Sequence, residues 1–224
     1  MNHLKKFTLS ILFIGMIAVV AATYFLLFVN EESKVPKEIE EEEKIYIKQY
    51  GNRKVFAIDP TEKDKNSKYI IYFHGGAYMG GLEKYHWEFI EKLSNETGYG
   101  IIIPDYPLAP KYTYKEVFEM VEPLYKDIIK EIKPENIIMM GDSAGGGLAL
   151  ALEEKLGEKE IEVPEKLILI SPWIDTRMTN PKIEEVQEYD KDLSKEKLKL
   201  AGIAYAGEKE NNSYLVNPID RASK

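Results

Sequence analysis

One serine stands in a sequence context that could turn its hydroxyl into a nucleophile. Ser143 is the central residue of Gly141-Asp142-Ser143-Ala144-Gly145, which follows the apolar run 136–140. A G-x-S-x-G pentapeptide between a strand and a helix is typical of a nucleophile elbow, a strained turn that lifts the serine hydroxyl clear of a sheet. Gly146 and Gly147 come next, and residues without a Cβ allow a helix to pack closely against its strand. We therefore predict that Ser143 is the catalytic nucleophile.

A second turn could stabilise the negative charge that such an attack creates on a carbonyl oxygen. His74-Gly75-Gly76-Ala77-Tyr78 follows the apolar run Tyr69–Phe73. An H-G-G turn after a strand is the pattern of the oxyanion loop in lipases and esterases, whose backbone N–H groups act together with that of the residue after the nucleophile. Preformed donors of this kind lower the barrier by several kcal/mol. We predict an oxyanion hole built from the backbone N–H groups of Gly75, Gly76 and Ala144.

These two motifs, together with Asp105-Tyr106-Pro107-Leu108-Ala109-Pro110, resemble those of the hormone-sensitive-lipase-like family of α/β-hydrolases, the acetyl esterases and lipases. The resemblance covers roughly residues 69–218, with the motifs in the family's order and approximate spacing. It implies an α/β fold of the α/β-hydrolase type, a mostly parallel sheet with helices on both faces, here incomplete at its C-terminal edge. It also implies hydrolysis of short-acyl carboxylic esters without a metal or an organic cofactor. Pro107 replaces the arginine that the family usually has in this loop.

The residues that should activate the serine are missing from the sequence. A serine hydroxyl needs a neighbouring base that a third group holds in place, and an α/β-hydrolase supplies them in the order Ser, Asp or Glu, His. All three histidines, His3, His74 and His86, precede Ser143. The resemblance implies that the acid and the base lie on loops after the next two core strands, and the sequence stops before either loop. We assign His74 to shaping the oxyanion loop and His86 to an apolar helix face.

Two classes of function remain open at this point. The first is a serine esterase that is impaired because the triad Asp and His are absent, as the product of an interrupted gene or as one half of a split hydrolase that a C-terminal fragment complements. The alternative is a non-catalytic, membrane-anchored binding or interaction protein that keeps the hydrolase fold. A protein whose ligand binding is indifferent to Ser143 would favour the alternative.

The hydrophobic pattern predicts the elements that must position these motifs. Short apolar runs alternate with segments of helical period, which indicates a parallel sheet covered on both faces. The predicted parallel strands are Tyr69–Phe73, 100–103, 136–140 and 167–170, after a hairpin of Ile45–Tyr50 and Arg53–Ile58. The predicted helices are 82–98, 113–132 and 144–157.

Three segments carry further expectations about the elements. Pro123 predicts a kink or a late start in the helix 113–132. The segment 189–205 has helical spacing and resembles the family's cap-region helix. The run 167–170 should form an exposed apolar edge of the sheet, which invites aggregation or pairing with another chain.

The amino end predicts a membrane anchor. Residues 7–29 form an uncharged apolar run after Lys5 and Lys6, and about 20 such residues span a bilayer as a helix. The positive-inside rule would keep the two lysines in the cytoplasm and place the rest of the protein outside the cell membrane. A cleaved signal peptide, which would give a secreted protein, is the alternative, because small residues follow an apolar stretch of suitable length.

The sequence therefore predicts three parts: an anchor or signal peptide at 1–30, an acidic linker at 31–44, and a partial α/β-hydrolase domain at 45–224. The glutamate-rich linker could be an extended tether or a charged surface helix. The net charge of −8 argues against nucleic acid as a partner, and the absence of cysteine excludes disulfides and thiol catalysis. The expected partners are a small-molecule ester, the membrane through residues 7–29, and a complementing C-terminal hydrolase fragment.

Overall fold

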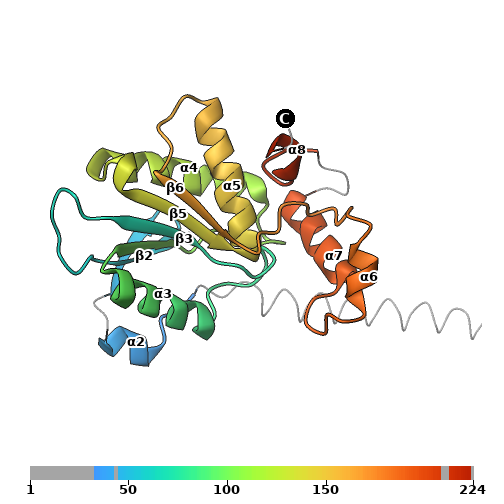
Figure 1. Ribbon diagram of the computed structural model, residues 1–224, viewed down its shortest axis with the longest axis horizontal. Coiled ribbons are helices and arrows are strands. Elements are labelled where there is room, and N and C mark those ends of the chain that lie inside the picture. The colour runs from blue at the N-terminus through green and yellow to red at the C-terminus, as the bar shows by residue number, and fades with distance from the viewer. Residues whose placement is uncertain (1–32, 43–44, 208–211, 223–224) are drawn as a thin grey trace, which may run out of the picture. The chain divides into compact units, whose positions relative to one another are not determined.

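One mixed sheet of six strands organises the fold, with the strand order β1-β2-β4-β3-β5-β6 (Figure 1). β1 (Ile45–Tyr50) and β2 (Arg53–Ile58) form the predicted antiparallel hairpin, and β2 also runs antiparallel to β4 (Gly100–Pro104). This half of the sheet leads the chain into the parallel half, where both candidate motifs lie.

The structure is a computed structural model that describes residues 33–42, 45–207 and 212–222. The chain divides into the units 1–31 and 32–224. The predicted anchor at 7–29 lies outside the described residues. Within the described ranges, no helix combines the length and the apolar character that crossing a membrane requires.

The parallel half of the sheet confirms the four apolar runs as strands. β3 (Tyr69–Phe73) lies between β4 and β5 (Ile137–Asp142), and β6 (Lys166–Ile170) pairs with the other side of β5. β6 is the outermost strand, and its Ile168 and Ile170 side chains remain 37% and 39% exposed. The described sheet therefore ends on an apolar edge, as expected.

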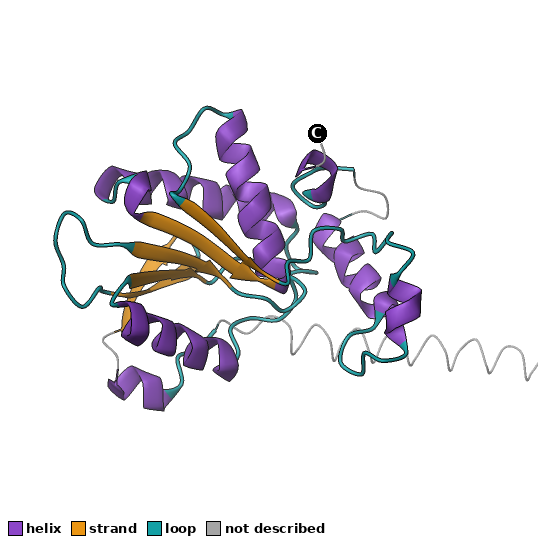
Figure 2. Cartoon of the chain, viewed as in Figure 1, coloured by secondary structure: helices purple, strands orange, loops and turns teal. Residues whose placement is uncertain are grey.

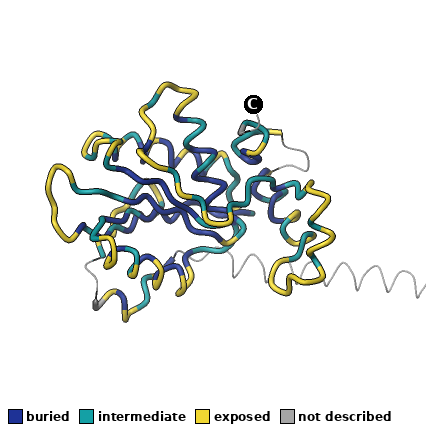
Figure 3. The backbone as a smooth tube through the Cα atoms, viewed as in Figure 1, coloured by how far each residue is buried: buried dark blue, intermediate teal, exposed yellow. Residues whose placement is uncertain are grey.

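Helices cover both faces of the sheet (Figure 2). α4 (Tyr114–Glu131) and α5 (Ser143–Glu158) lie on one face, and α3 (Lys84–Thr97) lies on the other, with the short α2 (Lys37–Glu42) beside it. Figure 3 shows that the buried part of the backbone follows the central strands and much of α5. Nine of the sixteen residues of α5 are buried, so this helix lies deep in the core.

The central strands β3 and β5 begin with unbroken apolar runs because both faces of each strand are buried against helices. In β3, Ile70 and Tyr72 join the core cluster that includes α3, whereas Ile71 and Phe73 join the cluster that includes α4 and α5. Successive side chains of a strand point to opposite faces, so an unbroken apolar run supplies both clusters. Two-sided burial is thus the cause of the pattern on which the strand predictions were based.

The predicted late start of the helix at Pro123 is wrong. α4 begins after Thr113, whose side chain accepts a hydrogen bond from the backbone N–H of Lys115. The Glu116 carboxylate accepts the backbone N–H of Thr113 in return. This capping box fixes the start of the helix. The cap and the buried face of α4 outweigh the cost of about 3 kcal/mol that a proline in a helix interior carries.

Part of the predicted linker belongs to the folded domain. Of the two alternatives for 31–44, the structure shows the helix, α2, and Ile39 on it is 5% exposed and packs in the cluster with α3. Ser33 is also buried, and its hydroxyl donates a hydrogen bond to Asp105 Oδ1 at 2.7 Å. Residues 33–40 therefore pack on the domain rather than forming a solvated tether.

The helix predicted at 189–205 is shorter than expected. α7 runs over Lys195–Ala206, because the Ser194 side chain accepts the backbone N–H of Lys197 and caps the helix there. Two short helices flank it in sequence, α6 (Ile183–Gln187) and α8 (Ile219–Ala222).

Candidate active site

Ser143 lies at the sharp turn between β5 and α5. The strand ends at Asp142 and the helix begins at Ser143, whose φ is +48°. A positive φ is unfavourable for a residue with a Cβ, so the backbone is strained at this residue. The strand, turn and helix that the sequence predicted around Ser143 are all present.

The glycines that flank the serine are required by close backbone contacts. A Cβ on Gly145 would lie 2.0 Å from the carbonyl oxygen of Phe73, and a Cβ on Gly141 would lie 2.4 Å from the Gly145 backbone. Real Cβ atoms do not come this close to other atoms, so neither position accepts a side chain without movement of the backbone. The first turn of α5 can thus lie directly against β3.

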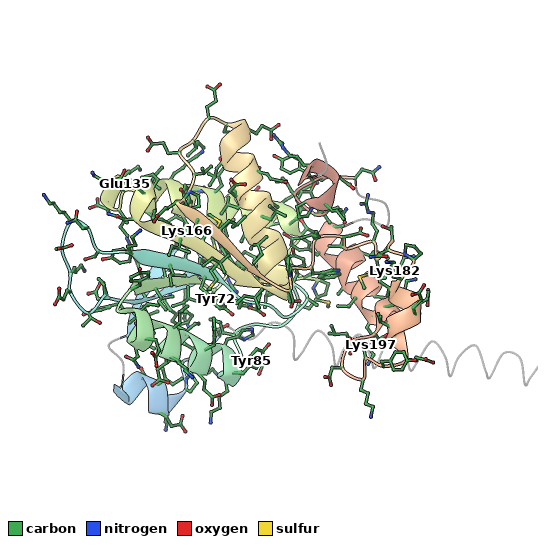
Figure 4. All side chains as sticks on the ribbon, viewed as in Figure 1. Tyr72, Tyr85, Glu135, Lys166, Lys182 and Lys197 are labelled. Carbon is green, nitrogen blue, oxygen red and sulfur yellow. The ribbon has the colours of Figure 1, made fainter. Side chains whose placement is uncertain are left out.

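The sheet register brings the two predicted motifs together. Phe73 and Gly141 are neighbours in the parallel pair of β3 and β5, so both turns leave the sheet at the same edge. The carboxyl ends of parallel strands are where α/β proteins bind ligands. In Figure 4, Tyr72 lies toward this end of the sheet and Tyr85 lies at the facing end of α3. A third connection reaches the turn from β6, because the Trp173 N–H donates to the Ser143 carbonyl at 2.7 Å.

The loop after β3 is a tight turn centred on Gly76. Its carbonyl oxygen accepts the N–H groups of Met79 at 2.9 Å and Gly80 at 2.8 Å. Gly76 has a φ of +110°, and a Cβ there would lie 2.7 Å from the Gly80 carbonyl oxygen. Ala77 and Tyr78 follow at φ of +54° and +60°. Three consecutive residues with positive φ make this the most strained part of the loop.

Asp142 connects this loop to the turn at the serine. Its Oδ1 accepts hydrogen bonds from the Tyr72 hydroxyl at 2.6 Å and from the Gly75 N–H at 2.9 Å. Its Oδ2 lies 3.8 Å from His86 Nε2, too far for a hydrogen bond but close enough for electrostatic attraction. Burial favours the neutral acid, but His86, Tyr72 and the Gly75 N–H together outweigh it, so the pKa of Asp142 is lowered. The carboxylate is therefore ionised at neutral pH.

This contact changes the assignment of one predicted oxyanion donor. The sequence predicts that the Gly75 N–H is a donor in the oxyanion hole, but in the structure that N–H already donates a hydrogen bond to Asp142. The H-G-G and G-x-S-x-G motifs signalled that these segments meet, but not that a carboxylate joins them.

His74 lies in the position expected of a residue that shapes the loop. It is fully buried, its Nδ1 donates to the Gly75 carbonyl at 2.7 Å, and its ring stacks on Tyr106 at a centroid distance of 4.4 Å. Burial lowers its pKa to about 4, so the imidazole is neutral at pH 7. The Tyr106 hydroxyl also donates a hydrogen bond to the His74 carbonyl at 2.6 Å, which holds the start of the loop in place.

Neither described histidine is arranged as a base for the serine. His86 is buried, and its Nδ1 accepts the Glu83 N–H at 2.9 Å, so its proton sits on Nε2 and faces Asp142. Within the part of the chain that the structure describes, no hydrogen bond reaches the Ser143 hydroxyl. The third histidine, His3, lies outside the described residues.

Aromatic side chains lie beside the loop. Tyr78 is buried and stacks on Tyr205 of α7 with ring centroids 3.6 Å apart and an angle of 3° between the planes. Trp173 lies 5.7 Å from Tyr78. Tyr205 was missed, because nothing in its spacing relates it to a loop more than a hundred residues earlier.

A buried ion pair supports the 105–110 loop next to His74. Arg53 of β2 donates from Nε to the Asp105 carbonyl at 2.7 Å, and its Nη2 lies 3.2 Å from Asp105 Oδ2. The sequence did not predict this pair, because Arg53 lies in the hairpin. Among residues 33–42, 45–207 and 212–222, no three His, Asp or Glu side chains cluster closely enough to hold a metal ion.

Sequence comparisons relate the chain to esterases. A family profile described as the alpha/beta hydrolase fold matches residues 70–224. An esterase of Acinetobacter venetianus is 37% identical over 137 residues, which are 61% of this chain and 45% of that protein. Esterase LipU of Mycobacterium tuberculosis is 34% identical over 112 residues, which are 50% of this chain and 37% of that protein. The matched part of the chain thus spans less than half the length of these curated relatives.

Solved structures share the same fold. A Staphylococcus aureus protein superposes with a TM-score of 0.81 at 25% identity, over 88% of this chain and 67% of that chain. An esterase from the bacterial hormone-sensitive lipase family superposes with a TM-score of 0.71 at 25% identity, over 78% of this chain and 59% of that chain. The family profile match at residues 70–224 includes both candidate motifs.

Proposed function

This chain belongs to the hormone-sensitive-lipase-like family of α/β-hydrolases, and on that basis we propose that it carries the nucleophile and the oxyanion hole of a serine carboxylic-ester hydrolase. The main support is the turn at Ser143, where a positive φ at the end of β5 coincides with a glycine loop one strand away. Strain at one residue beside a preformed loop is typical of a functional site.

In the proposed reaction, the Ser143 Oγ attacks the ester carbonyl and the developing oxyanion accepts hydrogen bonds from backbone N–H groups. We assign these donors to Gly76 and Ala144. Ala144 lies in the first turn of α5, where backbone N–H groups have no partner within the helix and the helix dipole favours negative charge. Gly75 instead holds the loop through Asp142. Glycine at both loop positions lets the backbone approach a substrate closely.

The proton acceptor for Ser143 belongs to the same proposal. We propose that a C-terminal hydrolase fragment carrying an Asp and a His completes the site, because neither described histidine contacts the serine and the chain matches less than half of its curated relatives. In subtilisin, loss of the triad histidine lowers kcat by roughly a millionfold, while the oxyanion hole and substrate binding alone keep the rate about 10³ to 10⁴ times that of the reaction in water. We expect a loss on the same order for this chain in the absence of a base.

The experiment is covalent labelling of the full-length chain with a fluorophosphonate probe, with the labelled peptide identified by mass spectrometry. We expect slow labelling at Ser143, none at this peptide in Ser143→Ala, and a faster rate when a C-terminal hydrolase fragment with an Asp and a His is added. Turnover of an activated acetyl ester should follow the same order. Absence of labelling with and without the fragment, or equal labelling in Ser143→Ala, would contradict the proposal.

The short-acyl substrate and the location outside the cell membrane remain part of the proposal. The residues that would form the anchor lie outside the described ranges, so the test is biochemical. Proteases added to intact cells should cut an epitope placed after Lys224 if residues 7–29 hold the domain on the outer side. Protection of the epitope would argue against that orientation.

A non-catalytic binding protein is the second candidate. It is favoured by one observation, namely that the ring nitrogens His74 Nδ1 and His86 Nδ1 are both used within the protein and neither histidine reaches Ser143. Under this alternative, an ester analogue would bind equally well to the wild type and to Ser143→Ala, and the added fragment would not change labelling.

A further inference from the structure

Asp142 occupies the position immediately before a helix but does not act as a helix cap. It is the N-cap residue of α5, where an aspartate normally accepts a backbone N–H of the first turn. In the structure, its side chain makes no such hydrogen bond with α5. A residue type well suited to capping is thus used for something else.

Both carboxylate oxygens of Asp142 face away from the helix, toward the loop after β3 and the start of α3. Oδ1 accepts the Gly75 N–H at 2.9 Å and the Tyr72 hydroxyl at 2.6 Å, and Oδ2 lies 3.8 Å from His86 Nε2. Burial and the Asp142 carboxylate also raise the pKa of Tyr72 far above its usual value, so Tyr72 remains a donor. These contacts therefore connect the turn at Ser143 with the loop at Gly76.

The loop lies so close to this carboxylate that its position depends on it. A Cβ on Gly75 would lie 2.3 Å from Asp142 Oδ2. The next residue, Gly76, begins the tight turn closed by the N–H groups of Met79 and Gly80. A shift of Gly75 away from Asp142 would therefore carry the Gly76 N–H with it.

We propose that Asp142 is a positioning residue: it fixes the loop that bears the Gly76 N–H relative to Ser143, and it leaves the first-turn N–H groups of α5 unblocked for the oxyanion. This proposal rests on the proposed function for its consequence in catalysis, but the contact itself does not. An oxyanion hole requires donors held in place before the reaction, since reorganisation during the reaction forfeits much of their effect.

Three substitutions separate loop positioning from helix capping. Asp142→Asn keeps an oxygen that can accept the Gly75 N–H. Asp142→Ser supplies a good N-cap for α5, but its side chain is too short to make the same contact with Gly75. Asp142→Ala supplies neither function. The three variants therefore give different orders of effect under the two explanations.

The first measurement is independent of activity. In the full-length chain labelled with ¹⁵N-glycine, the Gly75 amide proton should resonate downfield and exchange slowly with solvent because it donates to a carboxylate. We expect its exchange to be about tenfold faster or more in Asp142→Ser and Asp142→Ala, and within about threefold of wild type in Asp142→Asn, as befits loss of one hydrogen bond. Wild-type exchange in Asp142→Ser or Asp142→Ala would overturn the proposal.

The second measurement links the contact to the reaction. The rate of fluorophosphonate labelling at Ser143 should fall about tenfold or more in Asp142→Ser and Asp142→Ala and should be restored in Asp142→Asn. If Asp142→Ser labelled at the wild-type rate while Asp142→Ala did not, the residue would be a helix cap and the proposal would be wrong. If the wild type were not labelled either with or without the added fragment, the proposed function would fail, but the Gly75 exchange rates would still decide the positioning role.

Discussion

Gly145 shows how little space surrounds the turn at the candidate nucleophile. We expect Gly145→Ala to lower the free energy of unfolding by about 2 kcal/mol or more, because its Cβ would lie 2.0 Å from the Phe73 carbonyl oxygen. Gly157→Ala is the matched control in the same helix, since no atom lies within 4 Å of the added Cβ. It should be neutral or stabilising by up to about 1 kcal/mol. Urea denaturation measures both, and equal effects would contradict the packing explanation.

His74 predicts how stability depends on pH. Burial lowers its pKa to about 4, whereas an unfolded chain has an ordinary histidine pKa near 6.5, so the unfolded state binds the proton more readily. The contribution of His74 is therefore complete above roughly pH 6.5 and is lost as the pH falls toward 4, by about 3 kcal/mol in all.

The measurement is the free energy of unfolding between pH 7 and pH 4 for the wild type and His74→Asn. The low pKa of Asp142 gives a loss in the same direction as the pH falls through its folded-state value, so only the difference between the two proteins reports on His74. Parallel curves would show that His74 does not titrate as described.

At this scale the sequence predicts the residue types of the site but not the contacts between them. Two short motifs are enough to predict roles for Ser143, Gly76 and Ala144, because strained turns and close backbone contacts admit few residue types. The Asp142 contacts could not, since a carboxylate before a helix is expected to cap it. Its actual partners depend on a side-chain orientation that tertiary packing decides.

Among the elements, α7 supports the loop at Gly76 through one aromatic contact. Tyr205 stacks on Tyr78, and its hydroxyl has no hydrogen-bond partner among the described residues. We expect Tyr205→Ala to lower the free energy of unfolding by about 3 kcal/mol and to speed hydrogen exchange over 76–80, because the ring fills the space beside the loop. Tyr205→Phe keeps the ring and removes the unpaired hydroxyl, so it should match or exceed the wild-type stability.

Thermal unfolding and hydrogen-exchange mass spectrometry give the two readouts for these variants. If Tyr205→Ala left exchange over 76–80 unchanged, α7 would not support the loop. If Tyr205→Phe were as destabilised as Tyr205→Ala, the hydroxyl rather than the stack would be responsible.

The accuracy of the element predictions follows from what buries each element. The strands were located within one or two residues. For the central strands the reason is that burial on both faces leaves an unbroken apolar run. The helices were harder to bound: Ser194 starts α7 later than its hydrophobic spacing suggests, and the capping box at Thr113 keeps α4 continuous through Pro123. Caps depend on single polar side chains, which hydrophobic periodicity does not register.

At the scale of the whole molecule, we expect the exposed apolar edge at β6 to promote self-association. The Ile168 side chain is 37% exposed, whereas Leu169 packs against the core cluster that includes α4 and α5. We expect Ile168→Lys to reduce aggregation at high concentration and to change the free energy of unfolding by less than about 0.5 kcal/mol, because a charge on an edge strand opposes pairing with another chain.

Leu169→Lys is the control for the same edge. It places a charge against the core cluster, so it should lower the free energy of unfolding and should not reduce aggregation. Light scattering and urea denaturation distinguish the two variants. Aggregation that is unchanged in Ile168→Lys would show that association uses another surface.

The short segment at Ser33 has a practical consequence for anyone who shortens the amino end. The Ser33 hydroxyl donates a hydrogen bond to Asp105 and accepts one from the Leu82 N–H at 3.0 Å, so it links the loop after β4 to the segment before α3. Removing the chain up to the first strand would delete both hydrogen bonds. The Asp105 carboxylate, 1% exposed, would then keep Arg53 but lose its serine donor in the interior. A truncation before residue 32 keeps the two Ser33 hydrogen bonds, whereas a truncation at residue 45 removes them.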